Sequence, residues 1–269
     1  MPTYQTVFIT GCANGIGKHL AEVFYQKGYA VVATDIAIAT LQNQTQHWEV
    51  SRSLILTLDV TNSEQWRAVV GKCVDKFGRI DIFINNAGVI VPGFLAELSL
   101  ESIDLQVGVN IKGVLYGAKL AAAQMIKQSS GHIINVASLA GVAPIYGLPI
   151  YSATKFAVRA FSIAIAYEMK QYGINVSVIC PDLVNTNMLT LQLDHPAAAL
   201  TFSGNQHLQV EDIERAVFER ALGKKQLEIM VPPSRGWQAK IGNLFPKIGF
   251  LLTKQLVKKG LLRQASMRH

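Results

Sequence analysis

Short apolar runs alternate with longer stretches of helical length through most of the 269-residue chain. Each run is largely apolar throughout, which is typical of strands buried on both faces of a parallel sheet. The predicted strands are Val7–Thr10, Ala30–Thr34, Leu54–Leu58, Ile80–Ile84, His132–Val136, Ile174–Ile179 and Glu228–Val231. The predicted helices are Ile16–Lys27, Gln65–Phe77, Leu100–Lys127, Tyr151–Gln171 and Val210–Leu222. This order predicts an α/β fold, a doubly wound parallel sheet of about seven strands with helices on both faces.

The composition favours a single domain, because half of the residues are hydrophobic and α/β sheets of this size commonly stay whole. No uncharged apolar stretch reaches the roughly 18 residues of a membrane span. The first residues carry no basic segment before their apolar run, so we expect no signal peptide. The cysteines Cys12, Cys73 and Cys180 are widely spaced, which favours a cytoplasmic location and neither a disulfide framework nor a metal site.

The formal net charge of +7 comes from the end of the chain. Residues 229–269 contain eight Lys and Arg and no Asp or Glu, so 17 basic and 18 acidic residues remain in the rest of the chain. A nucleic-acid-binding protein would need a basic patch on its main body. We therefore expect no nucleic-acid partner.

A glycine-rich turn, TGCANGIG at residues 10–17, follows the first predicted strand and opens the first predicted helix. Gly11 allows a tight turn, Gly15 allows a phosphate to approach the backbone, and Gly17 allows close helix–strand packing. The amides at the helix start would face the phosphates of a dinucleotide. The candidate phosphate-binding residues are Gly11, Asn14, Gly15, Ile16 and Gly17. Taken alone, the turn also fits simple packing without a ligand.

Asp35 ends the second predicted strand, 18 residues after Gly17. At this spacing a carboxylate can accept hydrogen bonds from both hydroxyls of an adenosine ribose, and it would repel a 2′-phosphate. No Arg or Lys lies beside Asp35 or within the glycine turn to offset this repulsion. The pattern favours NAD(H) over NADP(H).

Three side chains point to the chemistry. Ser138 follows the fifth predicted strand, and Tyr151 and Lys155 lie on one face of the next helix, four residues apart. A neighbouring ammonium would favour the phenolate form of Tyr151. Tyr151 would then exchange a proton with an alcohol or carbonyl oxygen that Ser138 holds by a hydrogen bond. Each residue alone has a structural explanation, but the three in this setting are specific.

The chain here resembles the short-chain dehydrogenase/reductase family over residues 5–231, with a Rossmann-like fold. The matching pieces are residues 10–17, Asp59 and Val60, 85–88 (NNAG), Asn110, Ser138, 151–155 (YSATK) and 181–186 (PDLVNT). The family usually has glycine where this chain has Asp182. We interpret Asp182 as a substitution tolerated by an adaptable turn; the alternative is a contact with a polar or cationic group of the substrate.

The resemblance also implies residue roles. Asp59 and Val60 would contact adenine, and Asn86, Ala87 and Gly88 would close the fourth strand against the cofactor. Asn110 would hold a water in a proton relay to Lys155. Lys155 and Tyr151 would also contact the nicotinamide ribose, and Thr186 would bind the carboxamide. The family likeness, with the small residues along the helix from Tyr151, predicts a homodimer or homotetramer.

The substrate is expected to be a hydrophobic alcohol or carbonyl compound, because the residues near the reacting oxygen are largely apolar. These residues are Val89, Ile90, Val91, Leu139, Val142, Ile145, Tyr146, Leu148, Pro149 and Val184. We assign residues 1–231 to a dinucleotide-binding catalytic domain with a substrate lid at about 182–209. His195 and His207 fall in this lid and are expected to face solvent.

Residues 232–269 form the predicted C-terminal extension, a basic amphipathic segment in which Pro246 suits a first helical turn. The apolar residues on one arc of its helix are Ile241, Leu244, Phe245, Ile248, Leu251, Leu252 and Leu256. The segment fits either peripheral contact with an anionic membrane or a cap over the substrate cleft or a partner subunit. The predicted function is hydride transfer between NAD(H) and a hydrophobic substrate; the alternative is a catalytically silent NAD-binding scaffold or sensor, in the cytoplasm or at a membrane surface.

Overall fold

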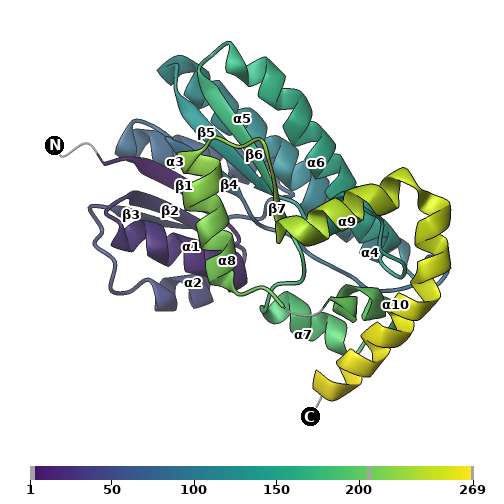
Figure 1. Ribbon diagram of the computed structural model, residues 1–269. Coiled ribbons are helices and arrows are strands. Elements are labelled where there is room, and N and C mark those ends of the chain that lie inside the picture. Colours follow the sequence, from purple (N-terminus) through teal and green to yellow (C-terminus); the bar gives the residue numbers. More distant parts are fainter. Residues whose placement is uncertain (1–3, 205–206, 268–269) are drawn as a thin grey trace.

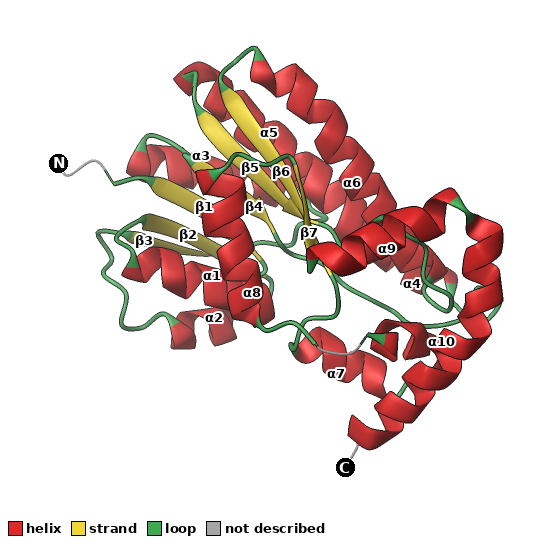
Figure 2. Cartoon of the chain, in the orientation of Figure 1, coloured by secondary structure: helices red, strands yellow, loops and turns green. Residues whose placement is uncertain are grey.

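The computed structural model describes residues 4–204 and 207–267, without the side chains of Ile248 and Phe250. Its centre is one parallel sheet of seven strands in the order β3-β2-β1-β4-β5-β6-β7 (Figures 1 and 2). The strands are β1 Thr6–Thr10, β2 Ala30–Asp35, β3 Ser53–Thr57, β4 Ile82–Asn85, β5 Gly131–Val136, β6 Ile174–Pro181 and β7 Glu228–Val231. The predicted doubly wound sheet is confirmed, and each predicted strand coincides with an observed one to within a few residues.

The helices cover both faces of the sheet. They are α1 Gly15–Gln26, α2 Ile38–Gln44, α3 Ser63–Phe77, α4 Leu100–Val107, α5 Val114–Gln128, α6 Pro149–Lys170, α7 Asn187–Leu193, α8 Val210–Arg215, α9 Pro233–Leu244 and α10 Pro246–Met267. The prediction of one regular helix over Leu100–Lys127 is wrong in detail. A π-helical segment, Gly108–Gly113, lies between α4 and α5, and it carries Asn110. The short helix α2 was not predicted.

Alternate residues of each strand pack against opposite helix layers. Val7 and Ile9 of β1 belong to a core shared with α1 and α8, whereas Phe8 between them packs with Trp66 of α3. The second core also includes residues of α5 and α6. Because both faces of the sheet are buried, the strands are largely apolar.

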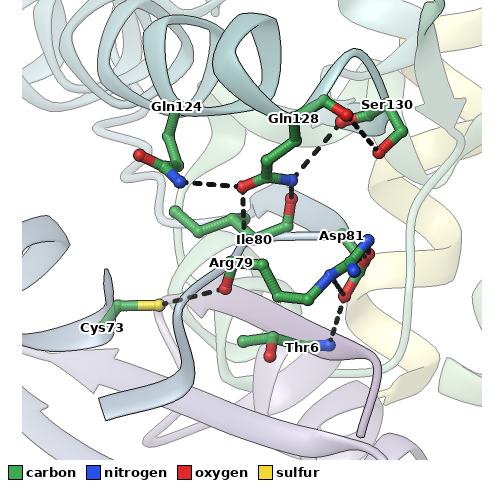
Figure 3. Close-up of polar contacts among 8 residues, drawn as sticks. All are labelled: Thr6, Cys73, Arg79, Ile80, Asp81, Gln124, Gln128 and Ser130. Atoms are coloured by element: carbon green, nitrogen blue, oxygen red, sulfur yellow. Dashed lines mark hydrogen bonds and ion pairs between the residues drawn. The ribbon is translucent and has the colours of Figure 1, made fainter. Parts of the chain in front are cut away.

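A polar cluster fastens the amino edge of the sheet (Figure 3). The Asp81 carboxylate accepts hydrogen bonds from the Thr6 backbone N–H, at 2.8 Å, and from the Arg79 guanidinium. The side-chain amide of Gln128, at the end of α5, bonds both the N–H and the C=O of Ile80. These contacts join β1, the start of β4 and α5 at the edge opposite to the candidate site.

The C-terminal extension consists of α9 and α10, with Pro246 as the first residue of α10, as predicted. Figure 1 shows α10 running beside α7 at the outer edge of the molecule. The helix packs on a 3-10 segment, Pro196–Ser203. Its side chain Gln264 donates hydrogen bonds to the backbone oxygens of Gln192 and His195. Within the described residues, no helix has the length and apolar character needed to cross a membrane.

Candidate functional site

A cavity of about 480 Å³ opens at the carboxyl edge of the sheet. Its walls come from the segments that follow β1, β2, β4, β5 and β6. The sheet order places β1 between β2 and β4, so the chain leaves β1 and β4 in opposite directions at this point. Ligands of doubly wound sheets bind at such a switch point.

The glycine turn forms one wall of this cavity. Gly11 and Gly15 have φ values of +72° and +55°, which residues with a side chain rarely adopt. A Cβ atom at Gly17 would collide with the carbonyl oxygen of Gly11, so only glycine allows α1 to pack this closely. Gly17 therefore allows the close packing behind the turn and is not among the described lining residues. Gly11, Asn14, Gly15 and Ile16 line the cavity.

The start of α1 is suited to an anion. Within the described residues, the side chain of Asn14 makes no capping hydrogen bond, and the first turn of α1 contains no acidic residue. The amide of Asn187 in α7 instead reaches the Asn14 side-chain oxygen at 3.4 Å. The backbone N–H groups at the start of this 12-residue helix thus lie at the cavity, and the Asn14 side chain does not accept a hydrogen bond from them. A phosphate group would satisfy them.

Asp35 lies where β2 ends and lines the same cavity. Its carboxylate accepts hydrogen bonds from the backbone N–H groups of Ala13 and Ala37, at 2.8 and 2.9 Å. These two bonds fix the carboxylate beside the glycine turn. Asp59 and Val60 are not among the described residues that line the cavity. Asp59 bonds Thr61 and Val60 is buried.

The segment after β4 is fastened to the glycine turn. The side-chain amide of Asn86 donates to the carbonyl oxygens of Thr10 and Gly11, at 3.0 and 3.2 Å. The backbone N–H groups of Asn86 and Ala87 both donate to the Thr10 hydroxyl. Asn86, Ala87 and Gly88 line the cavity, so the structure brings together these residues and the glycine turn, as predicted.

Ser138, Tyr151 and Lys155 line the cavity together. The Ser138 oxygen, just after β5, accepts a hydrogen bond from the Ala140 N–H at 3.0 Å. The Lys155 ammonium lies 5.7 Å from the centre of the Tyr151 ring and donates to the Val136 carbonyl oxygen at 3.0 Å. Both residues stand in the first two turns of α6, which Pro149 opens.

Burial controls the ionisation of this pair. It raises the pKa of Tyr151 to about 12, and a hydrogen bond with Ser138 opposes this shift only in part. It lowers the pKa of Lys155 to about 8. Burial disfavours both charged forms and is the largest influence on each group. That the ammonium favours the phenolate stays a prediction. At neutral pH the phenol carries its proton.

Asn110 lies behind the cavity rather than in its lining among the described residues. Its side chain is fully buried and bonds both the N–H and the C=O of Val89, at 2.8 and 2.9 Å, and the Thr154 hydroxyl, at 3.1 Å. A Cβ atom at Gly88 would lie 3.4 Å from both Asn110 Oδ1 and Lys155 Nζ. Asn110 thus adjoins Lys155 across Gly88, and its role in a relay stays a prediction.

The segment after β6 contributes Asp182 and Thr186 to the lining. Asp182 is not among the residues with positive φ, so glycine is not required there. Its N–H donates to the Val231 carbonyl oxygen, and its carboxylate accepts a hydrogen bond from Arg235 Nε at 2.8 Å. Asp182 thus pairs with a cation of the chain's own C-terminal extension. A contact between Asp182 and a polar or cationic group of the substrate stays a prediction.

Apolar side chains make up most of the remaining lining. The predicted ones that line the cavity are Val89, Ile90, Val91, Leu139, Ile145, Leu148 and Val184. Among the described lining residues, the predicted Val142, Tyr146 and Pro149 are absent. The cavity lining also includes residues that were not predicted from the sequence, among them Leu105, Leu183, Met188, Leu191, Gln192 and Thr201. His195 is exposed and His207 is half-buried beside Met267.

The sequence matches the short chain dehydrogenase family model over residues 5–196. The chain belongs to the short-chain dehydrogenase/reductase family of oxidoreductases. It is 31% identical over 227 residues to an uncharacterized oxidoreductase of Staphylococcus aureus strain USA300, covering 84% of this chain and 95% of that protein. An uncharacterized oxidoreductase of Staphylococcus saprophyticus is 34% identical over 185 residues, which cover 68% of this chain and 79% of the relative.

Solved structures of short-chain dehydrogenase/reductases share the fold. A Burkholderia phymatum protein in complex with NAD superposes with a TM-score of 0.81 at 24% identity, over 93% of this chain and 97% of that one. ElxO with bound NADP superposes with a TM-score of 0.74 at 26% identity, over 84% and 97% of the two chains. The family uses nicotinamide cofactors, and these two neighbours hold different ones.

Proposed function

We propose that this short-chain dehydrogenase/reductase transfers a hydride between NAD(H) and a hydrophobic alcohol or carbonyl compound. The observation that carries the proposal is that Ser138, Tyr151 and Lys155 line one cavity with the glycine turn. A binding protein without turnover has no chemical need for a serine, a tyrosine and a lysine in that arrangement.

The cofactor fits the residues present. The start of α1 would hold the pyrophosphate, and the Asp35 carboxylate would accept the ribose hydroxyls. This supports NAD(H) over NADP(H). Asn86, Ala87, Gly88 and Thr186 would surround the rest of the cofactor, with Lys155 and Tyr151 at the nicotinamide ribose. Adenine contacts by Asp59 and Val60 are carried over from the family likeness alone.

Tyr151 is the proposed acid and base. A bound nicotinamide would supply the hydride for reduction of the carbonyl carbon, or take it in oxidation. The Tyr151 hydroxyl would donate its proton to the carbonyl oxygen in reduction, giving an alcohol, and would take that proton back in oxidation. Ser138 would hold the reacting oxygen, and Asn110 would hold a water that connects Lys155 to solvent. A phenol that is protonated at neutral pH is ready to act as the donor.

The substrate is proposed to be hydrophobic because the cavity lining beyond Ser138 and Tyr151 is mainly aliphatic. We propose residues 1–231 as the catalytic domain and the segment of about 182–209, which includes α7, as a substrate lid; residues 205 and 206 lie outside the described structure. Residues 232–269 are the proposed C-terminal extension, of which the structure describes 232–267.

We also propose a homodimer or homotetramer in the cytoplasm. One face of α6 exposes the small side chains of Ala153, Ala160 and Ala164 to solvent, and Ala157 lies half-buried on it. Small residues in this pattern allow two helices to approach closely. The cysteines are buried and free, which suits a reducing compartment.

The purified protein tests the function. NADH and NAD are offered with retinoid, steroid, fatty and short-chain carbonyls and alcohols, and the near-ultraviolet absorbance of NADH is followed. We expect turnover of at least one hydrophobic substrate by the wild type and none above background by Tyr151→Phe. Tight NAD binding without turnover of any compound would instead support the scaffold or sensor.

A further inference from the structure

The two faces of the C-terminal extension differ. The inner face of α10 packs against the rest of the protein: Gly260 lies against the backbone of Ala199, and the Gln264 side chain is buried, at 2% exposure. On the outer side of α9 and α10 large apolar side chains remain in solvent. Trp237 is 61% exposed, Leu244 71% and Leu251 79%. Ile241, Phe245 and Leu252 are also exposed.

These residues lie in α9, at its end and in α10, two consecutive helices of which α10 runs along the outer edge of the molecule (Figure 1). Trp237, Ile241, Leu244 and Phe245 recur at helical spacing and form one stripe along α9 and its end. We call Trp237, Ile241, Leu244, Phe245, Leu251 and Leu252 the extension surface. Single exposed apolar residues are ordinary, but an exposed group of this size marks an interaction site.

The charged side chains of the C-terminal extension are all basic. Arg235 and Lys240 are paired with Asp182 and Glu228 of the main body. Lys247, Lys254 and Lys258 of α10 are exposed, and residues 229–269 include no acidic residue. The extension therefore presents apolar groups and ammonium groups together, and its sequence includes no acidic side chain.

We propose that the extension surface docks on the anionic face of a lipid bilayer. Trp, Phe and Leu side chains insert at the boundary of head groups and acyl chains, and flanking lysines bind anionic lipids. A second copy of the chain fits less well, because a two-fold contact places the same patch against itself and so lysine near lysine. An acidic protein would satisfy the lysines, but it would not require an apolar stripe along two helices.

Docking would also place the proposed substrate lid close to lipid. The inner face of α10 holds the 3-10 segment that contributes Thr201 to the cavity lining. Since a helix with its side chains is about 10 Å across, the lid would lie roughly one helix diameter from the bilayer. Access of a lipid-dissolved substrate rests on the proposed function; the docking itself does not.

The wild-type protein provides a first test through tryptophan fluorescence. Of its three tryptophans, Trp48 and Trp66 are 6% and 0% exposed, so a change in surroundings is reported mainly by Trp237. With vesicles of equimolar phosphatidylglycerol and phosphatidylcholine, we expect a blue shift and acrylamide quenching reduced by about half. Pure phosphatidylcholine and high salt should weaken both effects. Unchanged emission with anionic vesicles would overturn the proposal.

Co-sedimentation with the same vesicles compares matched variants. Leu251→Ser should lower binding, whereas Val50→Ser, at a residue 80% exposed on the main body, should not. Lys254→Gln with Lys258→Gln should weaken binding on the order of tenfold, and Lys72→Gln with Lys119→Gln should leave it unchanged. Melting temperatures verify folding.

Two outcomes contradict membrane docking. One is equal vesicle binding by the wild type and by both extension variants. The other is the absence of vesicle binding together with a change of oligomeric state in Leu251→Ser, which would assign the extension surface to a second copy. NAD binding is measured in parallel, so that a failure of the proposed function is recognised separately.

Discussion

The Asp182 carboxylate accepts a hydrogen bond from Arg235 Nε over 2.8 Å, and this ion pair joins two distant parts of the chain. Asp182 directly follows β6 and lines the cavity, while Arg235 stands in the first turn of α9. The charge that replaces the usual glycine is therefore balanced by the C-terminal extension. Through this contact the extension helps to position the cavity wall.

A double-mutant cycle measures this ion pair. The side chains are 15% and 33% exposed, so we expect Asp182→Asn and Arg235→Gln to show a coupling of about 0.5–1 kcal/mol in the free energy of unfolding. Lys240→Gln is the control, because Lys240 pairs with Glu228. Its effect on the free energy of unfolding should add to that of Asp182→Asn without coupling. Additive effects of the Asp182 and Arg235 changes would mean that the contact contributes no stability.

Tyr151→Phe removes the proposed proton donor and keeps the ring. We expect kcat to fall by roughly 10²–10⁴-fold, with NADH affinity, measured by fluorescence titration, nearly unchanged. Tyr146→Phe is the matched control, since Tyr146 is 54% exposed and lies outside the described cavity lining. Comparable losses in the two variants would remove Tyr151 from its proposed role.

The rate of carbonyl reduction should fall with rising pH. The pKa of Lys155 is lowered to about 8, so its ammonium is present below that pH and is lost as pH rises through it. The raised pKa of Tyr151, about 12, keeps the phenol protonated over the whole neutral range. We expect kcat/KM for reduction to be highest below about pH 8 and to decline above it. A reduction rate that climbs between neutral and alkaline pH would contradict this assignment.

Asp35→Asn tests the choice of cofactor. Neutralising the carboxylate removes its repulsion of a 2′-phosphate, so the preference for NADH over NADPH should drop on the order of tenfold. Asp75→Asn is the control, because this carboxylate is exposed on α3 and does not line the described cavity. The comparison uses the ratio of kcat/KM values. A wild-type enzyme that prefers NADPH would show that Asp35 does not set the choice.

Gly260→Ala tests the packing of α10 against the 3-10 segment Pro196–Ser203. A Cβ atom at this position would collide with the Ala199 carbonyl oxygen, so α10 must move away from the 3-10 segment. We expect faster hydrogen exchange in α7 and α10 and a lower melting temperature. At Gly249, in the same helix, the nearest atom would be 3.7 Å from the Cβ. Gly249→Ala should therefore be neutral or stabilising by up to about 1 kcal/mol, and an equal loss in both variants would contradict this docking.

The sequence by itself determined the sheet, the glycine turn and the spacing of the residues proposed to be catalytic, Ser138, Tyr151 and Lys155. Apolar runs buried on two faces, a glycine at positive φ such as Gly11, and the four-residue spacing of Tyr151 and Lys155 are local properties that near neighbours in the chain impose. The place of Asp35 at a strand end, on which its proposed contact with a ribose depends, follows in the same way.

Only the tertiary structure decided how these residues are surrounded. The partner of Asp182 is 53 residues away, so no local pattern contains it. The π-helical segment that turns Asn110 toward Val89 interrupts a stretch that reads as regular helix. The direction in which the pKa of Tyr151 shifts depends on how completely other segments bury the phenol, and burial is a property of the packed fold. The same packing gives α10 one face held against the 3-10 segment Pro196–Ser203 and another left to solvent.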